Sequence, residues 1–334
     1  MSKPRRWIAQ RIEQLDPETD YVEIWRLTIT YGLDDFSANL SYTQVFPHFY
    51  IARHGAQPLW HEGDGKVVER ATQRVEDTIR ANLVWWHYGP HHPKTQKSVE
   101  GINKLHAFHA KRYPGSFAHQ DDYVYTLAFS AASLHRLNLQ LGLPGYTEKQ
   151  KIAAHRFWRE MGKLFVDEHG NAILDFPDDW DSMMAFLDDF ENRPWPQHEE
   201  GRMVTHAILD QFAHRFFPRP LHGLARALAV STMHPTTWRV HSMTPLPAPA
   251  RFLLLRSTGL LLRLQQTLRP DPTDNYQEIL EGLTRDQLRE RSAGIRELDK
   301  EFSHFFRERH GLPPRGTSPE AAAQVIPPAT SFTA

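Results

Sequence analysis

Apolar residues recur at three- and four-residue intervals in nearly every segment of the 334-residue chain. That spacing places them on one face of a helix, whereas a half-buried strand needs strict alternation of apolar and polar residues, which no segment shows. The chain also lacks a βαβ rhythm and a Gly-rich phosphate loop, which argues against a Rossmann or P-loop nucleotide site. The sequence therefore predicts an all-α protein.

Turn and capping signals divide this pattern into helices. Thr147 with Gln150 and Thr284 with Gln287 form capping boxes, and Gly142 follows a long apolar helix as a C-terminal signal. Helices are expected over residues 22–43, 67–86, 99–111, 123–141, 147–165, 178–190, 199–216, 221–231, 247–268 and 284–309. No shift in composition interrupts residues 1–310, so we expect one large helical domain. Residues 311–334 are rich in Pro, Ala, Ser and Thr and are expected to form a disordered tail.

Composition narrows the classes of function. Hydrophobic residues make up 40% and charged residues 24% of the chain, as in ordinary soluble proteins. The formal net charge of −1 argues against nucleic acid as a partner, because proteins that bind phosphate backbones usually carry a basic excess. There is no cysteine, which excludes thiolate nucleophiles, iron–sulfur clusters and Cys-ligated haem or zinc. The 20 His residues permit metal or haem ligation.

The sequence predicts no transmembrane helix, because it contains no run of 18 apolar residues. Residues 250–268 come closest, but Arg251, Arg256 and Arg263 interrupt this Leu-rich stretch. Its pattern favours an amphipathic helix packed on the core, and weak contact with a membrane surface stays open as the alternative. The N-terminus has positive charges without an apolar segment after them and is not a secretory signal. We therefore expect a cytoplasmic protein, of an oligomeric state that the sequence leaves open.

Two neighbouring helices carry the candidate site. Arg74 and Thr78 are four residues apart and share a helix face, as do His106 and His109, which are three apart. A basic residue and a hydroxyl on one helix, opposite an imidazole on the next, suit a flat anionic iron cofactor. The imidazole would ligate the metal and Arg74 would neutralise a carboxylate. Arg70 continues the same face one turn earlier.

Simpler explanations compete with this one. The basic row could pair with the neighbouring acids Glu69, Glu76 and Asp77 as a surface ion-pair row, and His106 could be a hydrogen-bonded core residue. The His106–His109 pair could also contribute to a zinc site, although the sequence shows no further ligand. A di-iron bundle would need two Glu-x-x-His motifs, and only residues 301–304 provide one.

Three segments together resemble the MpaB and rubber-oxygenase family, also called DUF2236. Arg74-Val-Glu-Asp-Thr78 is similar to the Arg-x-x-Lys-Thr helix of its rubber-cleaving members. Ile102-Asn-Lys-Leu-His-Ala107 is similar to the family's (Val/Ile)-x-x-(Leu/Met/Ile)-His-Ala segment, and residues 157–162 to its aromatic-Trp-x-x-x-Gly stretch. The order and spacing of the segments agree with the family over roughly residues 24–166.

The resemblance implies a fold, a cofactor and roles for single residues. Members are all-α, with a rubber-oxygenase or globin-like helical core, hold haem b and use dioxygen to cleave double bonds in isoprenoid chains. By this resemblance His106 is the proximal iron ligand rather than His109, which would line the cofactor. Arg74 and Thr78 support the haem, and Arg70 extends their face.

The chain also departs from the rubber-cleaving members. Asp77 stands where those members have a Lys of the distal pocket, so Thr78 and Asp77 are the candidate catalytic residues here. Glu62 and Glu69 are positional candidates for the family's distal Glu. We therefore expect a haem b oxygenase or oxidase that acts with dioxygen on an apolar or isoprenoid-like small molecule. The alternative is a cofactor-free helical binding or scaffold protein of the same fold.

Overall fold

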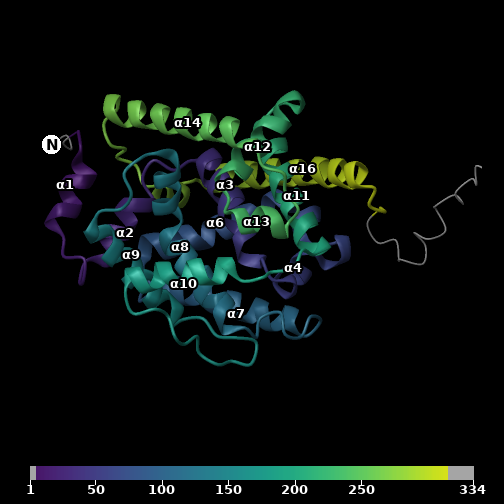
Figure 1. Cartoon of the computed structure of the whole chain (residues 1–334), viewed down its shortest axis with the longest axis horizontal. Helices are drawn as coiled ribbons and strands as arrows, with labels where there is room; N and C mark the ends of the chain where they lie inside the picture. The colour runs from purple at the N-terminus through teal and green to yellow at the C-terminus, as the bar shows by residue number, and fades with distance from the viewer. Residues whose placement is uncertain (1–4, 315–334) are drawn as a thin grey trace, which may run out of the picture.

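A computed structural model describes residues 5–314 and shows a stack of helices without a sheet (Figure 1). Within this range the extended backbone pairs only at two isolated bridges, Tyr31 with Asn275 and Val166 with Ala172. The all-α expectation is confirmed. The expected C-terminal tail lies outside the described residues except for residues 311–314, which follow the last helix.

Sixteen α-helices and three short 3₁₀ helices make up the described chain. Their bounds are α1 Trp7–Gln14, α2 Tyr21–Ile29, α3 Asp35–Val45, η1 Phe46–Tyr50, α4 Arg53–Trp60, η2 His61–Gly63, α5 Lys66–Glu69, α6 Ala71–Tyr88, α7 Pro93–Ala110, α8 Gln120–Leu141, α9 Glu148–Gly162, α10 Trp180–Asn192, α11 Glu199–Phe216, η3 Arg219–Leu221, α12 His222–Thr232, α13 Pro235–Val240, α14 Ala248–Leu268, α15 Tyr276–Glu281 and α16 Arg285–His310.

Helix α6 lies between two large apolar clusters and so has a fixed position. One cluster is built mainly from α2, α8, α9 and α10, and Trp85 of α6 belongs to it. The other is built from α3 to α6, α11 and α16, and it includes Val75 and Leu83. Burial of large side chains on both sides stabilises each contact by about 2 kcal/mol per residue. The helix that carries Arg74 and Thr78 is therefore held on two sides.

The expected helix over residues 22–43 is two helices, which corrects the sequence interpretation. α2 ends at Ile29, and α3 begins after Asp34, whose carboxylate accepts a 2.8 Å hydrogen bond from the Ser37 amide. Gly32 between them has φ +76°, a conformation that glycine adopts at little cost. The apolar spacing alone did not reveal this turn, because it continues across the break although α2 packs into the first cluster and α3 into the second.

The expected helix over residues 67–86 is also broken, at Arg70. This residue has φ −143° and ψ 53°, and it precedes α6 as its N-cap rather than lying within a helix. The carboxylate of Asp299 on α16 accepts hydrogen bonds from the amides of Thr72 and Gln73, at 2.6 and 3.2 Å. A cap supplied by another helix satisfies the amides that a helix start leaves unpaired. The row of Arg70, Arg74 and Thr78 is therefore not one continuous helix face.

Helix α7 begins earlier than expected. The expected helix started at residue 99, directly after Ser98, but α7 starts at Pro93, and the His92 ring accepts a 3.1 Å hydrogen bond from the Lys94 amide. Proline suits the first helical position because its missing N–H would be unpaired there. Ser98 instead accepts a 3.0 Å hydrogen bond from the Trp85 indole and so ties α7 to α6.

Helix α14 lies on the outside of the molecule, along the top edge in Figure 1. The core-helix interpretation is corrected here, since only Leu255 and Gly259 of this helix are buried. A Cβ on Gly259 would lie 2.0 Å from the Leu141 carbonyl oxygen, so glycine permits the close approach of α14 to α8. None of the helices within residues 5–314 combines the length and apolarity needed to cross a membrane.

Several of the histidines have structural partners around η1. The rings of His48, His198 and His241 lie within 2.8–3.1 Å of the backbone oxygens of Val45, Ile51 and Pro47 respectively. Burial lowers the pKa of all three, to about 3 for His241. These imidazoles are therefore neutral at pH 7 and donate to carbonyls that the short helix leaves unpaired.

Acid should destabilise the fold through these histidines. The unfolded chain protonates at its ordinary pKa of about 6.5 whereas folded His241 does not, so stability is complete above pH 6.5 and declines toward pH 3. Between pH 7.5 and 5 we expect His241 alone to cost about 2 kcal/mol in the free energy of unfolding, measured by urea titration. His241→Leu should unfold with a smaller pH dependence than the parent. A pH dependence of unfolding equal to the parent's in this variant would contradict the role given to His241.

Candidate functional site

Helices α6 and α7 pack side by side and bring Arg74 near His106 and His109. The pKa of His106 falls to about 4, first because the ring is desolvated and then through the positive charges of His109 and Arg74. The pKa of His109 is lowered in the same way by burial, His61 and Arg74. The structure thus brings together the residues that the sequence placed on two separate helix faces.

The His106 ring is held so that one nitrogen is left without a partner. It stacks on Phe117 with ring centroids 4.3 Å apart, and its Nδ1 lies 3.4 Å from the Tyr123 hydroxyl oxygen. That hydroxyl is also 3.5 Å from the Phe117 carbonyl oxygen. If it donates there, its oxygen accepts from His106 Nδ1–H, and the Nε2 lone pair stays available to a metal. No residue within 5–314 hydrogen-bonds to Nε2.

Arg74 has no ionic partner among the described residues. Its guanidinium lies over the Phe46 ring, 4.7 Å from the centroid, and its Nε is buried without a hydrogen-bond partner. A buried donor that makes no hydrogen bond costs about 1–3 kcal/mol. An unpaired guanidinium of this kind fits a carboxylate or another anion supplied by a ligand.

The acidic neighbours that could have paired with Arg74 are engaged elsewhere. Glu76 points to the other side of α6 and accepts from Arg215 at 2.9 Å and Arg291 at 2.7 Å. Glu69 accepts from Arg307 at 2.8 Å. These acids therefore form ion pairs with cations distant in the sequence, and in the described structure Arg74 is not part of an ion-pair row.

The remaining predicted site residues lie farther from the imidazole–guanidinium pair. Arg70 is exposed and lies before the start of α6. Asp77 is also exposed; it pairs with Lys66 and accepts a 2.6 Å hydrogen bond from the side-chain amide of Gln73. Thr78 is half-buried, and its hydroxyl donates a 3.0 Å hydrogen bond to the Arg74 carbonyl. Toward a carboxylate, Thr78 could donate only by giving up this bond within α6. Lys66 places its ammonium group against the Asp77 carboxylate.

A strained turn closes the site beside His109. His61, Glu62 and Gly63 have consecutive positive φ values of 46°, 58° and 95°, which for the first two is energetically unfavourable. The His61 ring lies 3.1 Å from the Tyr113 hydroxyl and 3.2 Å from Arg112, which also binds Glu62 at 3.1 Å. Glu62 was a positional candidate from the sequence, whereas His61 was not predicted. Its only local signal is Gly63, a residue type that often marks a turn.

No group of three or more His, Asp or Glu side chains is arranged to hold a metal ion within residues 5–314. Zinc and di-iron sites take three or more ligands from the protein, so the structure gives those alternatives no support. A haem iron takes four ligands from its porphyrin and needs as few as one from the protein. The pair of His106 and Arg74 is thus suited to a macrocycle rather than a bare ion.

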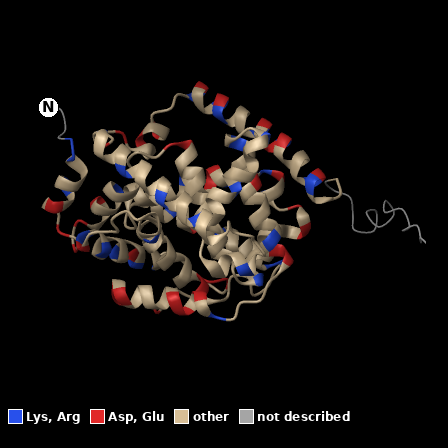
Figure 2. Cartoon of the chain, turned by 45° about the horizontal axis from the view of Figure 1, so that its top comes forward, with Lys and Arg blue, Asp and Glu red and all other residues tan. Residues whose placement is uncertain are grey.

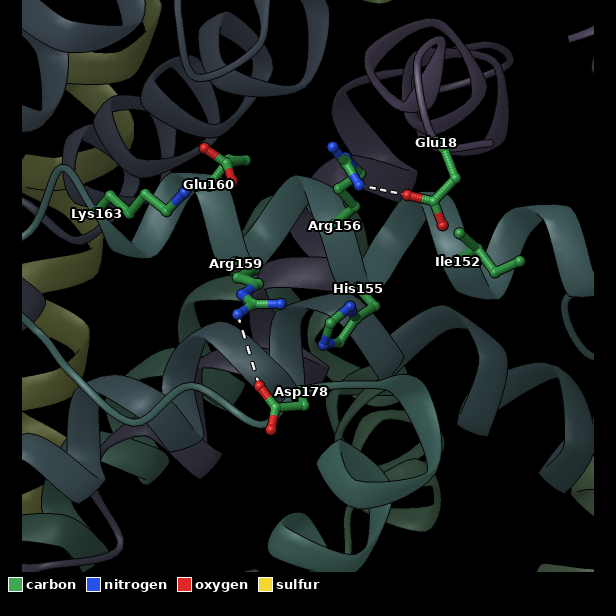
Figure 3. Close-up of a pocket in the computed structure, with 8 residues that line it drawn as sticks. All are labelled: Glu18, Ile152, His155, Arg156, Arg159, Glu160, Lys163 and Asp178. Atoms are coloured by element: carbon green, nitrogen blue, oxygen red, sulfur yellow. Dashed lines mark hydrogen bonds and ion pairs between the residues drawn. The ribbon is translucent and has the colours of Figure 1, made fainter. Parts of the chain in front are cut away.

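A surface cavity of about 300 Å³ lies apart from this site, on α9 (Figure 3). Its cations each have an acidic partner: Arg156 with Glu18, Arg159 with Asp178 at 3.6 Å, and Lys163 with Glu160 at 2.5 Å. His155 lies 2.8 Å from the Pro177 carbonyl oxygen. Because its charges are mutually satisfied, this cavity offers no free cation to an anionic ligand.

Comparison with known proteins places the chain in a class of oxygenase catalytic domains. Residues 51–264, from α4 through most of α14, match the family described as ER-bound oxygenase mpaB/B'/Rubber oxygenase, catalytic domain. Because this match spans more than half of the chain, the protein belongs to that family, as the three sequence segments predicted. No curated protein matched the chain in a sequence search.

Proposed function

We propose that this protein is a haem b-dependent oxygenase or oxidase that acts with dioxygen on an apolar or isoprenoid-like small molecule. The observation that carries the proposal is the juxtaposition of an unpaired, partly buried Arg74 and an imidazole with an unpartnered Nε2 on adjacent helices. In an oxygenase family this pair has the chemistry of one axial ligand and one propionate-binding group. Within residues 5–314, neither Arg74 Nε nor His106 Nε2 has a hydrogen-bond partner.

The donor set fits haem. Arg74 Nε is a buried donor that lacks an acceptor, and a propionate carboxylate supplies acceptors only. His106 is neutral at pH 7 because its pKa is about 4, so it needs no proton loss before it ligates iron. His109 shares the helix face and would line the macrocycle edge. Thr78 would support a propionate by turning its hydroxyl toward it, away from the Arg74 carbonyl to which it now donates.

When bound, haem would supply an iron at which dioxygen reacts with the substrate. The chain's own residues would hold and orient the haem: His106 would ligate the iron, Tyr123 would orient the His106 ring through Nδ1, and Arg74 would neutralise a propionate. Glu69 is bound to Arg307 and is not free for acid–base work. Asp77 makes its contacts with Lys66 and Gln73, so we assign no proton transfer to it.

The surroundings of His106 on α7 favour an apolar substrate. Leu105 and Phe108, on either side of His106 in the sequence, are exposed large apolar side chains. Exposed apolar groups beside a candidate site often mark where an apolar ligand approaches. The test is the spectrum of protein from haem-supplemented cells. A Soret band at about one haem per chain, with dioxygen uptake on adding an isoprenoid, is expected.

A protein that is colourless and fully folded and does not bind added haemin would overturn this proposal. That result would favour the alternative of a cofactor-free binding or scaffold protein. The family membership and the fold would remain as they are, because both rest on observations that do not involve haem.

Arg74→Ala should weaken haem binding without removing the axial ligand. The loss of one charge-assisted contact is worth about 1.5–3 kcal/mol, so the dissociation constant for haemin should rise about 10- to 100-fold. A haemin titration followed at the Soret band measures this change. Arg80→Ala is the matched control, because Arg80 lies on the same helix and is exposed. Equal affinity in the two variants would contradict the role of Arg74.

A further inference from the structure

Helix α14 exposes an apolar face that nothing in the described chain covers. Five leucines form this leucine face, with exposed fractions of 69%, 58%, 67%, 48% and 72%: Leu253, Leu260, Leu261, Leu264 and Leu268. Their spacings of seven, one, three and four residues keep them on the side of the helix opposite the buried Leu255 and Gly259. Exposed single leucines are common, but five on one side of a 21-residue helix mark an interaction surface.

The charged residues of α14 itself have one sign. The helix carries Arg251, Arg256 and Arg263 and no Lys, Asp or Glu, although the whole chain is nearly neutral. Arg256 and Arg263 are exposed along one flank of the helix. Arg5 adds a further cation at its C-terminal end, donating to the carbonyls of Thr267 and Leu268 at 2.7 and 2.8 Å. Figure 2 shows that acidic and basic residues are mixed over most of the molecule.

This charge pattern indicates which kind of partner binds the leucine face. A second copy docked through the same face would bring the arginines of both helices together without any acid on α14 to offset them. Like charges across an interface are unfavourable, which argues against a symmetric pair through this face. A surface that is apolar within and anionic at its boundary complements both the leucines and the arginines.

We propose that the leucine face of α14 docks the protein on an anionic lipid surface. The helix is about 31 Å long and would lie in the plane of the interface, with its leucines among the acyl chains and Arg256 and Arg263 at the headgroups. It is held to the protein through Gly259, which lets it approach α8. Helix α7, which carries His106, lies on the opposite side of the molecule from α14 (Figure 1), so this helix would lie away from the lipid.

Vesicle flotation of the full-length protein tests the proposal. The probes are vesicles of phosphatidylcholine alone and with about one third phosphatidylglycerol. Binding is expected to the second kind and to weaken with salt. The double variant Leu260→Glu with Leu264→Glu should lose binding, and Arg263→Gln should reduce it about fivefold, as about 1 kcal/mol per cation requires. Leu174→Glu and Arg289→Gln, at exposed positions away from α14, should bind like the parent.

Two outcomes would overturn the proposal. One is a parent protein that stays monomeric and does not float with the anionic vesicles. The other is a parent protein that does not float but is dimeric by light scattering and becomes monomeric in the Leu260→Glu, Leu264→Glu variant. The second result would assign the leucine face to a second copy. The substitutions lie at exposed positions, so circular dichroism should show an unchanged fold in each variant.

Discussion

Replacing His106 with alanine should abolish stable haem binding and remove the Soret band from the purified protein. Under our proposal the His106 ring nitrogen forms the single bond between the chain and the iron. Within the described site only His109, one turn away on α7, could take its place. The measurement is the pyridine haemochrome content per chain, compared between variant and parent. We expect less than a tenth of the parent's haem content.

The control for this variant is His91→Ala, since the His91 side chain is 70% exposed. It should retain full haem content. Circular dichroism and urea titration would show that His106→Ala still folds, with a cavity cost of a few kcal/mol at most. Full haem occupancy in His106→Ala would reject the ligand assignment, and the double variant with His109→Ala would then show whether the neighbouring ring replaces it.

Replacing Glu191 with alanine should lower the free energy of unfolding by about 3–5 kcal/mol. Glu191 is fully buried and accepts two hydrogen bonds from Arg136, at 2.7 and 2.6 Å, and one from the Tyr125 hydroxyl at 3.1 Å. Its removal would leave the Arg136 guanidinium, which is mostly buried, without its carboxylate. Because the pair joins α8 to α10, the loss should appear as a lower urea midpoint for the whole fold.

Glu100→Ala provides the matched comparison. Glu100 pairs with Lys104 one turn away on α7, but both side chains are largely exposed. A surface pair of this kind contributes about 0–1 kcal/mol. If the Glu191 and Glu100 variants lost the same free energy of unfolding, the buried pair would contribute no more than a surface pair, contrary to what its geometry indicates. Haem content should be unaffected in Glu100→Ala.

Much of the fold could be predicted from the sequence because several helix ends depend on residues that are close together in the chain. Thr147 and Thr284 begin helices through capping boxes, and Gly142 ends α8 in the left-handed conformation, all as expected. These features depend on residues within one turn of each other. The proximity of Arg74 to His106 was also predicted, because helical spacing and the family's segments both pointed to those positions.

Contacts between distant residues could not be read in the same way. The break before α6 depends on Asp299, which is 227 residues from the Thr72 amide that it caps. His61 reaches the site only because a strained turn lies against the end of α7. Neither contact leaves a periodic or a spacing signal in the chain.

By itself, the sequence determined the helical class, most helix ends and the two side chains on which the proposed site depends. Apolar periodicity, caps and residue types are local properties, so the order of residues is sufficient to specify them. Only the tertiary structure decided that Glu76 pairs with Arg215 and Arg291 while Arg74 is left unpaired. It also decided that the leucine face of α14 is exposed. Both depend on which helix faces meet, and that is set by packing among segments far apart in the chain.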